Sequence, residues 1–109
     1  MKQYEIWWAS LPGPIGRRPV LLLSRTPAYA YLSRVLVAEI TTQVRSIPQE
    51  VRLGRSEGLA RVCVANLDNV HAIGAQRLTA RVGALAPARQ REVKRALGYA
   101  LAWPELQIL

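Results

Sequence analysis

Two pairs of polar residues are the strongest candidates for chemistry in this sequence. Arg17 and Arg18 stand just before an apolar run that ends at Ser24, and Thr41 and Thr42 follow a second apolar run. A guanidinium can hold phosphate oxygens through paired hydrogen bonds, and a hydroxyl can donate one more. Side chains of these two types at the ends of buried strands are therefore suited to binding a phosphate group.

Chemistry based on a metal ion or a bound cofactor has no recognisable site in the sequence. One histidine, one cysteine and scattered carboxylates do not form a typical metal-binding cluster, and no phosphate-binding loop, dinucleotide fingerprint or Ser-His-Asp signature is present. The remaining phosphate chemistry is attack by an RNA 2′-hydroxyl on its own neighbouring phosphate. An arginine and a threonine can stabilise the developing charge, and His71 or Asp68 is a candidate for moving protons. We therefore expect no metal and no cofactor.

The charge of the chain favours an anionic partner. Its 109 residues carry a formal net charge of +8, and most of the basic residues are arginine. Arginine stays protonated and binds phosphate in a two-pronged fashion, which makes nucleic acid the first candidate and an acidic protein the second. The alternative is compositional, since a GC-rich genome also produces chains rich in Ala, Leu, Val and Arg.

The length and the N-terminal sequence predict one domain over residues 1–109 in the cytoplasm. No apolar stretch reaches the roughly 18 residues that span a bilayer, and the first residues lack the layout of a signal peptide. A single cysteine, Cys63, excludes an internal disulfide and fits a reducing compartment. With no His or acidic residue nearby in sequence, Cys63 is predicted to be an inert core residue.

Short strands and one helix define the expected fold. Tyr4–Ala9 is aromatic and β-branched, which predicts a first strand, and Pro87 opens the one long helix, which Pro104 ends. The helix carries an apolar stripe, Val93, Ala96, Leu97, Ala100 and Leu101. Further strands are expected at 20–24, 35–41, 50–53, 60–65, 66–73 (with or without a bulge) and 78–82. This pattern predicts a mainly β protein, a small antiparallel barrel or curled sheet with the helix at one end.

The adjacent residues Trp7 and Trp8 must point to opposite faces of the first strand. One ring is then expected in the core, and the other is free to stack on a base or to fill a subunit interface.

Several motifs follow one another in a characteristic order along nearly the whole chain. They are EIWW at 5–8, GRRPVLLLS at 16–24, ITTQ at 40–43, P-x-E-V-x-L at 48–53, GL at 58–59, DNVH-x-I at 68–73 and RVG-x-L at 81–85. In these motifs, and in the C-terminal helix, the chain resembles the MazF/PemK toxin family of type II toxin–antitoxin systems. The resemblance implies an SH3-like antiparallel barrel with one C-terminal helix (PemK/CcdB-like), assembled as a homodimer.

The same resemblance implies an activity and partners. It implies an mRNA interferase, a metal-independent and sequence-specific endoribonuclease that cuts single-stranded RNA and leaves a 2′,3′-cyclic phosphate and a 5′-hydroxyl. It also implies a cognate antitoxin whose acidic tail occupies the RNA groove, with DNA bound only through that complex.

Site residues carry over by position from the family motifs. Arg18 matches the catalytic arginine, Thr41 the catalytic threonine, and Asp68 an aspartate implicated in some members. His71 replaces the usual Arg or Lys and is a candidate RNA contact. The expected RNA-binding residues are Trp8, Arg17, Thr42 and Arg45.

The chain also departs from the family pattern. The loop from Leu11 to Arg17 is short and lacks an acidic insertion, Tyr4 stands where glycine is common, and Asn66 stands where some members have an active-site arginine. Two other readings remain open: a toxin of similar fold that poisons a topoisomerase through its C-terminal helix and tail, and a non-catalytic RNA-binding barrel.

Overall fold

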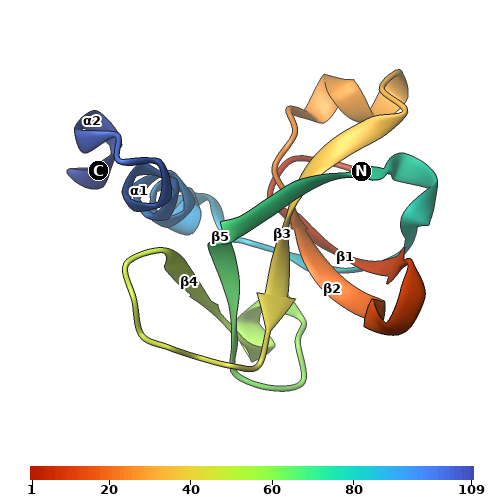
Figure 1. Cartoon of the computed structure of the whole chain (residues 1–109), viewed down its shortest axis with the longest axis horizontal. Helices are drawn as coiled ribbons and strands as arrows, with labels where there is room; N and C mark the ends of the chain where they lie inside the picture. The colour runs from red at the N-terminus through yellow and green to blue at the C-terminus, as the bar shows by residue number, and fades with distance from the viewer.

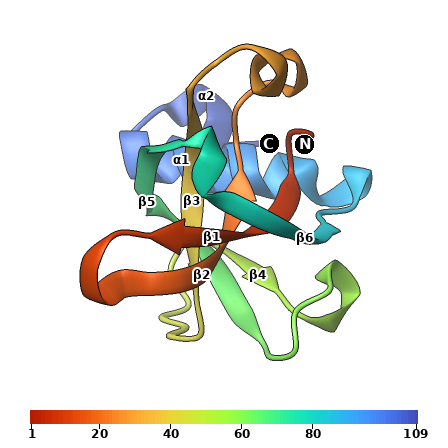
Figure 2. The same cartoon turned by 90° about the vertical axis from the view of Figure 1, so that its right-hand side faces the viewer.

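A computed structural model describes residues 1–109 and shows one antiparallel sheet of six strands (Figure 1). The strands are β1 (Glu5–Leu11), β2 (Gly16–Leu22), β3 (Arg34–Thr41), β4 (Glu50–Leu53), β5 (Cys63–Gly74) and β6 (Leu78–Ala84). Their order across the sheet is β4-β5-β3-β2-β1-β6, so most sequence neighbours are also neighbours in space. The sheet curls strongly, and β1 and β6 cross in front of the remaining strands in Figure 2. The predicted antiparallel curled sheet is confirmed.

Both faces of the curled sheet bury apolar side chains. Along β2, Leu21 points into a larger cluster with Ile6, Ala38 and Ile40, whereas its neighbours Val20 and Leu22 point into a smaller cluster on the other face. Successive residues of a strand face opposite sides, so a strand buried on both sides reads as a continuous apolar run. This explains the uninterrupted apolar sequence of β2.

The helix α1 (Gln90–Leu101) closes the larger cluster beside β4 and β5 (Figure 1). The predicted apolar stripe is confirmed for four of its members, but Leu101 is 47% exposed because the helix ends there and Ala102 turns into the left-handed region. Pro87 opens a 3-10 turn, Pro87–Arg89, so α1 begins three residues later than expected. A short additional helix, α2 (Pro104–Gln107), packs back on α1. No helix has the length and apolar character needed to cross a membrane.

The expected start of the second strand was wrong. β2 begins at Gly16 instead of Val20, so Arg17 and Arg18 lie inside the strand and not before it. The reason is that β1 continues to Leu11 and pairs with β2 as far as Gly16. Pro19 is tolerated because pairing with β3 starts only at the next residue. The strands expected at 60–65 and 66–73 are one long strand, β5, which has a bulge and begins only at Cys63.

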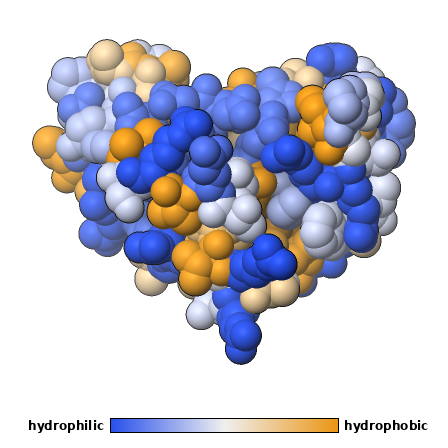
Figure 3. Space-filling model, turned by 60° about the horizontal axis from the view of Figure 1, so that its bottom comes forward, coloured by the Kyte–Doolittle hydropathy of each residue, from blue (hydrophilic) through white to orange (hydrophobic).

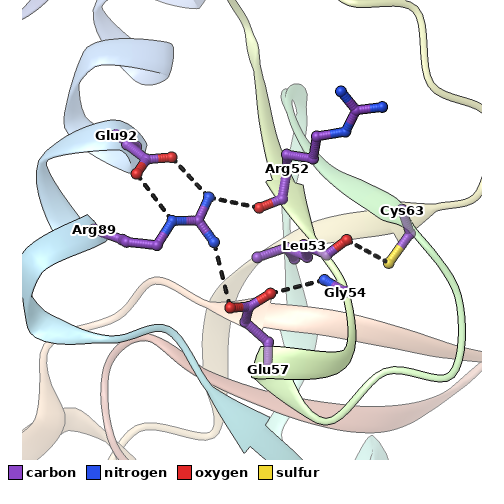
Figure 4. Close-up of polar contacts among 7 residues, drawn as sticks. All are labelled: Arg52, Leu53, Gly54, Glu57, Cys63, Arg89 and Glu92. Atoms are coloured by element: carbon purple, nitrogen blue, oxygen red, sulfur yellow. Dashed lines mark hydrogen bonds and ion pairs between the residues drawn. The ribbon is translucent and has the colours of Figure 1, made fainter.

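A charge network around the buried carboxylate of Glu57 joins the start of α1 to the β4 end of the sheet (Figure 4). The guanidinium of Arg89 donates to both carboxylate oxygens of Glu92, to Glu57 Oε2 at 3.3 Å and to the carbonyl of Arg52 at 2.6 Å. Glu57 is only 5% exposed, and its other oxygen accepts the backbone N–H of Gly54. The hydrogen bonds with Glu92 raise the pKa of Arg89 and lower that of Glu92. The turn before β5 is thereby fixed to the helix.

That turn also packs its backbone directly on β6, at a glycine. A Cβ on Gly83 would lie 2.0 Å from the carbonyl oxygen of Glu57, so Gly83→Ala must push the turn away from the strand. We expect a loss of roughly 1–3 kcal/mol in the free energy of unfolding, measured by urea denaturation. Gly74→Ala is the matched control, because the atoms nearest to its Cβ belong to the flexible side chain of Gln76. Equal effects of the two substitutions would contradict the contact.

Candidate active site

A groove of about 820 Å³ opens at the end of the sheet where β3 finishes. Arg17 and Arg18 reach it from β2, Thr41 and Thr42 from the end of β3, and Trp8 from β1. Figure 3 brings this end of the molecule forward and shows hydrophilic side chains spread across it with hydrophobic patches between them. Five of the predicted site residues therefore line one groove.

The register of β2 and β3 explains why Arg18 and Thr41 meet. Val20 pairs with Glu39 and Leu21 with Ala38 in this antiparallel ladder. This ladder ends at the pair Val20 and Glu39, and Arg18 and Thr41 each lie two residues beyond it. Residues two apart along a strand point to the same face, so Arg18 and Thr41 lie on one face of the sheet. Both residues also line a second, smaller cavity, so they form the wall between it and the groove.

The hydrogen bonds around Thr41 leave its proton available. Its Oγ1 accepts the backbone N–H of Gln43 at 3.1 Å. A hydroxyl that already accepts one bond can still donate its own hydrogen to a ligand oxygen. Arg18 is exposed and takes part in none of the ion pairs of the structure. The two side chains thus present hydrogen-bond donors at one place, as a phosphate requires.

Trp7 and Trp8 point to opposite faces of β1, and one of them packs in the core, as predicted. Trp7 packs against the smaller core cluster, and its indole N–H donates to Glu5 at 3.1 Å. Trp8 lines the groove, where the guanidinium of Arg17 lies over its ring, 4.1 Å from the ring centroid. A stacked guanidinium and indole form a flat, positively charged platform of the kind on which nucleobases stack.

Two further arginines, which the sequence analysis did not single out, also line the groove. Arg61 comes from the segment before β5 and Arg81 from β6. Arg81 belongs to a quoted motif, RVG at 81–83, but its approach to the groove depends on the pairing of β6 with β1. The position of Arg61 has no sequence signal, since it lies outside any regular element. With Arg17 and Arg18 they give the groove four guanidinium groups.

Glu5 anchors Arg81 and should make the fold sensitive to acid. Burial alone would raise the pKa of Glu5, but hydrogen bonds from Arg81, Trp7 and the backbone of Lys2 outweigh burial and hold it below its ordinary value of 4.5. A depressed carboxylate pKa stabilises the folded state above the unfolded pKa, and this stability is lost as the pH falls through the folded pKa. We expect the melting temperature to drop steadily below about pH 4.5, and Glu5→Gln to flatten that drop. An unchanged acid profile in Glu5→Gln would contradict the assignment.

The remaining predicted residues lie outside the groove. Arg45 lines the smaller cavity, of about 230 Å³, together with Arg18 and Thr41. Asp68 is exposed on β5 and lines neither cavity. The Nε2 atom of His71 lies 2.9 Å from Glu39, and His71 lines a third cavity. Neither Asp68 nor His71 therefore lines a cavity that Arg18 also lines.

Cys63 lies at the edge of the groove but is 4% exposed, and burial raises the pKa of its thiol. This agrees with the prediction of an inert core residue. No group of three or more His, Cys, Asp or Glu residues is close enough together to hold a metal ion.

A curled antiparallel sheet with a C-terminal helix and a groove lined by arginines and threonines defines the class, a small β protein whose groove is suited to an anionic ligand. The PemK-like, MazF-like toxins of type II toxin–antitoxin systems match residues 2–101, and the chain belongs to this family. The chain is 41% identical over 98 residues to the probable endoribonuclease MazF5 of Mycobacterium tuberculosis, covering 89% of each protein. It is 35% identical to the probable endoribonuclease MazF2 of the same species, covering 89% of this chain and 94% of that one.

Solved structures agree with this assignment. The Mycobacterium tuberculosis toxin MazF-mt6 superposes with a TM-score of 0.84 at 33% identity, covering 90% of this chain and 96% of the other. An endoribonuclease in complex with its cognate antitoxin, from a mycobacterial species, superposes with a TM-score of 0.82 at 27% identity, covering 95% and 97%.

Proposed function

We propose that this chain is the toxin of a type II toxin–antitoxin pair and a sequence-specific endoribonuclease that cuts single-stranded RNA without a metal ion in the cytoplasm. The observation that carries the proposal is the placement of Arg18 and Thr41 on one wall of a groove with four arginines. The family and the endoribonuclease relatives support the same reading.

In the proposed reaction the RNA supplies its own nucleophile. The 2′-oxygen forms a bond to the adjacent phosphorus while the bond from phosphorus to the 5′-oxygen breaks, giving a 2′,3′-cyclic phosphate and a 5′-hydroxyl. The 2′-hydroxyl loses a proton and the departing 5′-oxygen gains one. Arg18 and Thr41 donate hydrogen bonds to the phosphate oxygens as their negative charge grows. Preorganised donors of this kind need no rearrangement at the moment of reaction.

The experiment incubates the purified protein with a long RNA in EDTA and identifies the ends of the fragments. We expect cleavage in EDTA, with 5′-hydroxyl and cyclic phosphate ends. A substrate with one 2′-deoxynucleotide at a mapped site should be resistant there and cut elsewhere. Cleavage that needs magnesium, or that persists at the deoxy site, would overturn the mechanism.

The partners are part of the proposal. The four guanidinium groups of the groove suit an acidic antitoxin tail, in line with the relative solved with its cognate antitoxin. We also propose a homodimer, which sedimentation of the purified chain tests directly.

A second function is favoured by one feature, the exposed apolar residues at the C-terminal end. Leu101, Trp103 and Ile108 are 47%, 46% and 86% exposed. A topoisomerase-poisoning toxin would use such a surface for protein contact. A gyrase supercoiling assay beside the RNA assay separates the two, since only the topoisomerase poison blocks supercoiling.

A further inference from the structure

A second cavity lies beside the groove, and its lining contains no hydrophobic residue. It encloses about 230 Å³, and Arg18 and Thr41 separate it from the groove. A cavity of roughly 150 Å³ is enough to hold benzene, so this one has room for a six-membered heterocyclic ring. Its other lining residues are Glu39, Gln43, Arg45, Asn66 and Asn69, and we call it the polar pocket.

A bulge in β5 builds this pocket. Between the pairs Ala38↔Val70 and Ile40↔Ala65, β3 contributes one residue, Glu39, whereas β5 contributes the segment 66–69. The extra residues cannot stay in the ladder, so the strand bends outward and re-aims its side chains. Leu67 fixes the bulge, since its side chain is 2% exposed in the core and its N–H donates to the carbonyl of Gln49 at 2.9 Å.

The bulge leaves defined hydrogen-bonding groups in the pocket. The side-chain oxygen of Asn66 accepts the backbone N–H of Asp68 at 2.9 Å, so its NH₂ group is the part left to bind a ligand. Glu39 is held from the other side by His71 at 2.9 Å, and an ionised carboxylate can only accept further hydrogen bonds. The pocket therefore combines an oriented donor with an oriented acceptor.

We propose that the polar pocket binds the base of one of the two nucleotides joined by the scissile phosphate, and that it favours bases with an exocyclic amino group over uracil. The inference rests on the proposed function. A phosphate held between Arg18 and Thr41 has the groove with Trp8 on one side and the polar pocket on the other. Unpaired RNA bases are read by hydrogen bonds to their edges. An amino group offers two N–H donors to Glu39, whereas uracil offers only one ring N–H.

The test maps every cleavage site in an RNA library with randomised sequence. We expect the wild-type protein to show uracil depleted about fivefold or more at one position next to the cut. Glu39→Gln, which keeps an oxygen for His71, should relax that depletion. Asn66→Asp keeps the oxygen that Asp68 binds but turns the NH₂ donor into an acceptor, and should change the preferred base at the same position.

Gln49→Glu is the control for charge, because it adds a carboxylate close to the bulge but outside the polar pocket. We expect its base profile to match that of the wild type. If Asn66→Asp fails to fold by circular dichroism, Asn69→Asp at an exposed position of the same pocket takes its place. A wild-type enzyme that cuts, with the same base profile in all variants, overturns this inference alone. A wild-type protein that cuts no RNA overturns the proposed function instead, and this inference with it.

Discussion

Replacement of Arg18 by alanine is expected to lower kcat for RNA cleavage by about 100- to 1000-fold, the usual effect of removing one preorganised donor to a developing oxyanion. Arg18 is exposed and joins no ion pair in the structure, so its removal should leave the fold intact. The measurement is single-turnover cleavage of a short RNA containing one mapped site, with circular dichroism to verify folding.

Two further variants test whether the loss of activity in Arg18→Ala comes from a specific contact or from charge alone. Arg17→Ala removes a guanidinium of the same charge one residue away, which stacks on Trp8. We expect it to raise KM several-fold with kcat little changed, because it acts on binding and not on the reacting phosphate. Arg18→Lys keeps the charge but loses the planar fork, and should recover only part of the rate. Equal losses of kcat in Arg17→Ala and Arg18→Ala would show that cleavage requires positive charge in the groove but no specific contact from Arg18.

Arg89→Ala is expected to destabilise the fold by on the order of 2–4 kcal/mol. The substitution leaves the buried carboxylate of Glu57 without its cation and the carbonyl of Arg52 without a donor (Figure 4). Thermal unfolding followed by circular dichroism should show a melting temperature lower by about 10 °C or more.

The control for Arg89 lies two residues further along the chain, in the first turn of α1. Arg91 is exposed and takes part in no ion pair, so Arg91→Ala should change the free energy of unfolding by less than about 0.5 kcal/mol. Adding Glu57→Gln to Arg89→Ala should recover part of the lost stability, because the amide oxygen still accepts the N–H of Gly54 while the unpaired charge is gone. A double variant no more stable than Arg89→Ala would contradict the charge explanation.

Local sequence signals were sufficient for the long helix, for most of the strands and for the opposite directions of Trp7 and Trp8, but not for the short helix α2. Apolar runs and proline positions predicted the strands and the helix, and the strand expected at 50–53 coincides with β4. The start of β2 could not be predicted in this way, because it depends on how far β1 continues and pairs. For the same reason Arg17 and Arg18 were placed ahead of a strand that in fact contains them.

The composition of the site was only partly predictable. Arg18 and Thr41 were chosen by residue type and by family resemblance, and their catalytic roles remain predictions. Their position on one face of the sheet depends on the register of β2 and β3, which no single segment encodes. Arg61 and Arg81 reach the groove only through the folding of the whole sheet. The pairing of His71 with Glu39 likewise depends on the β3–β5 ladder.

The bulge in β5 also separates residues that can be substituted from the strands that must keep their positions. The ladder resumes its pairing on both sides of residues 66–69, and Thr41 is set by partners outside that segment. Asn66, Asp68 and Asn69 can therefore change without moving the strands that carry Arg18 and Thr41. Related chains could acquire new base preferences through a few substitutions in this segment while the chemistry of cleavage stays the same.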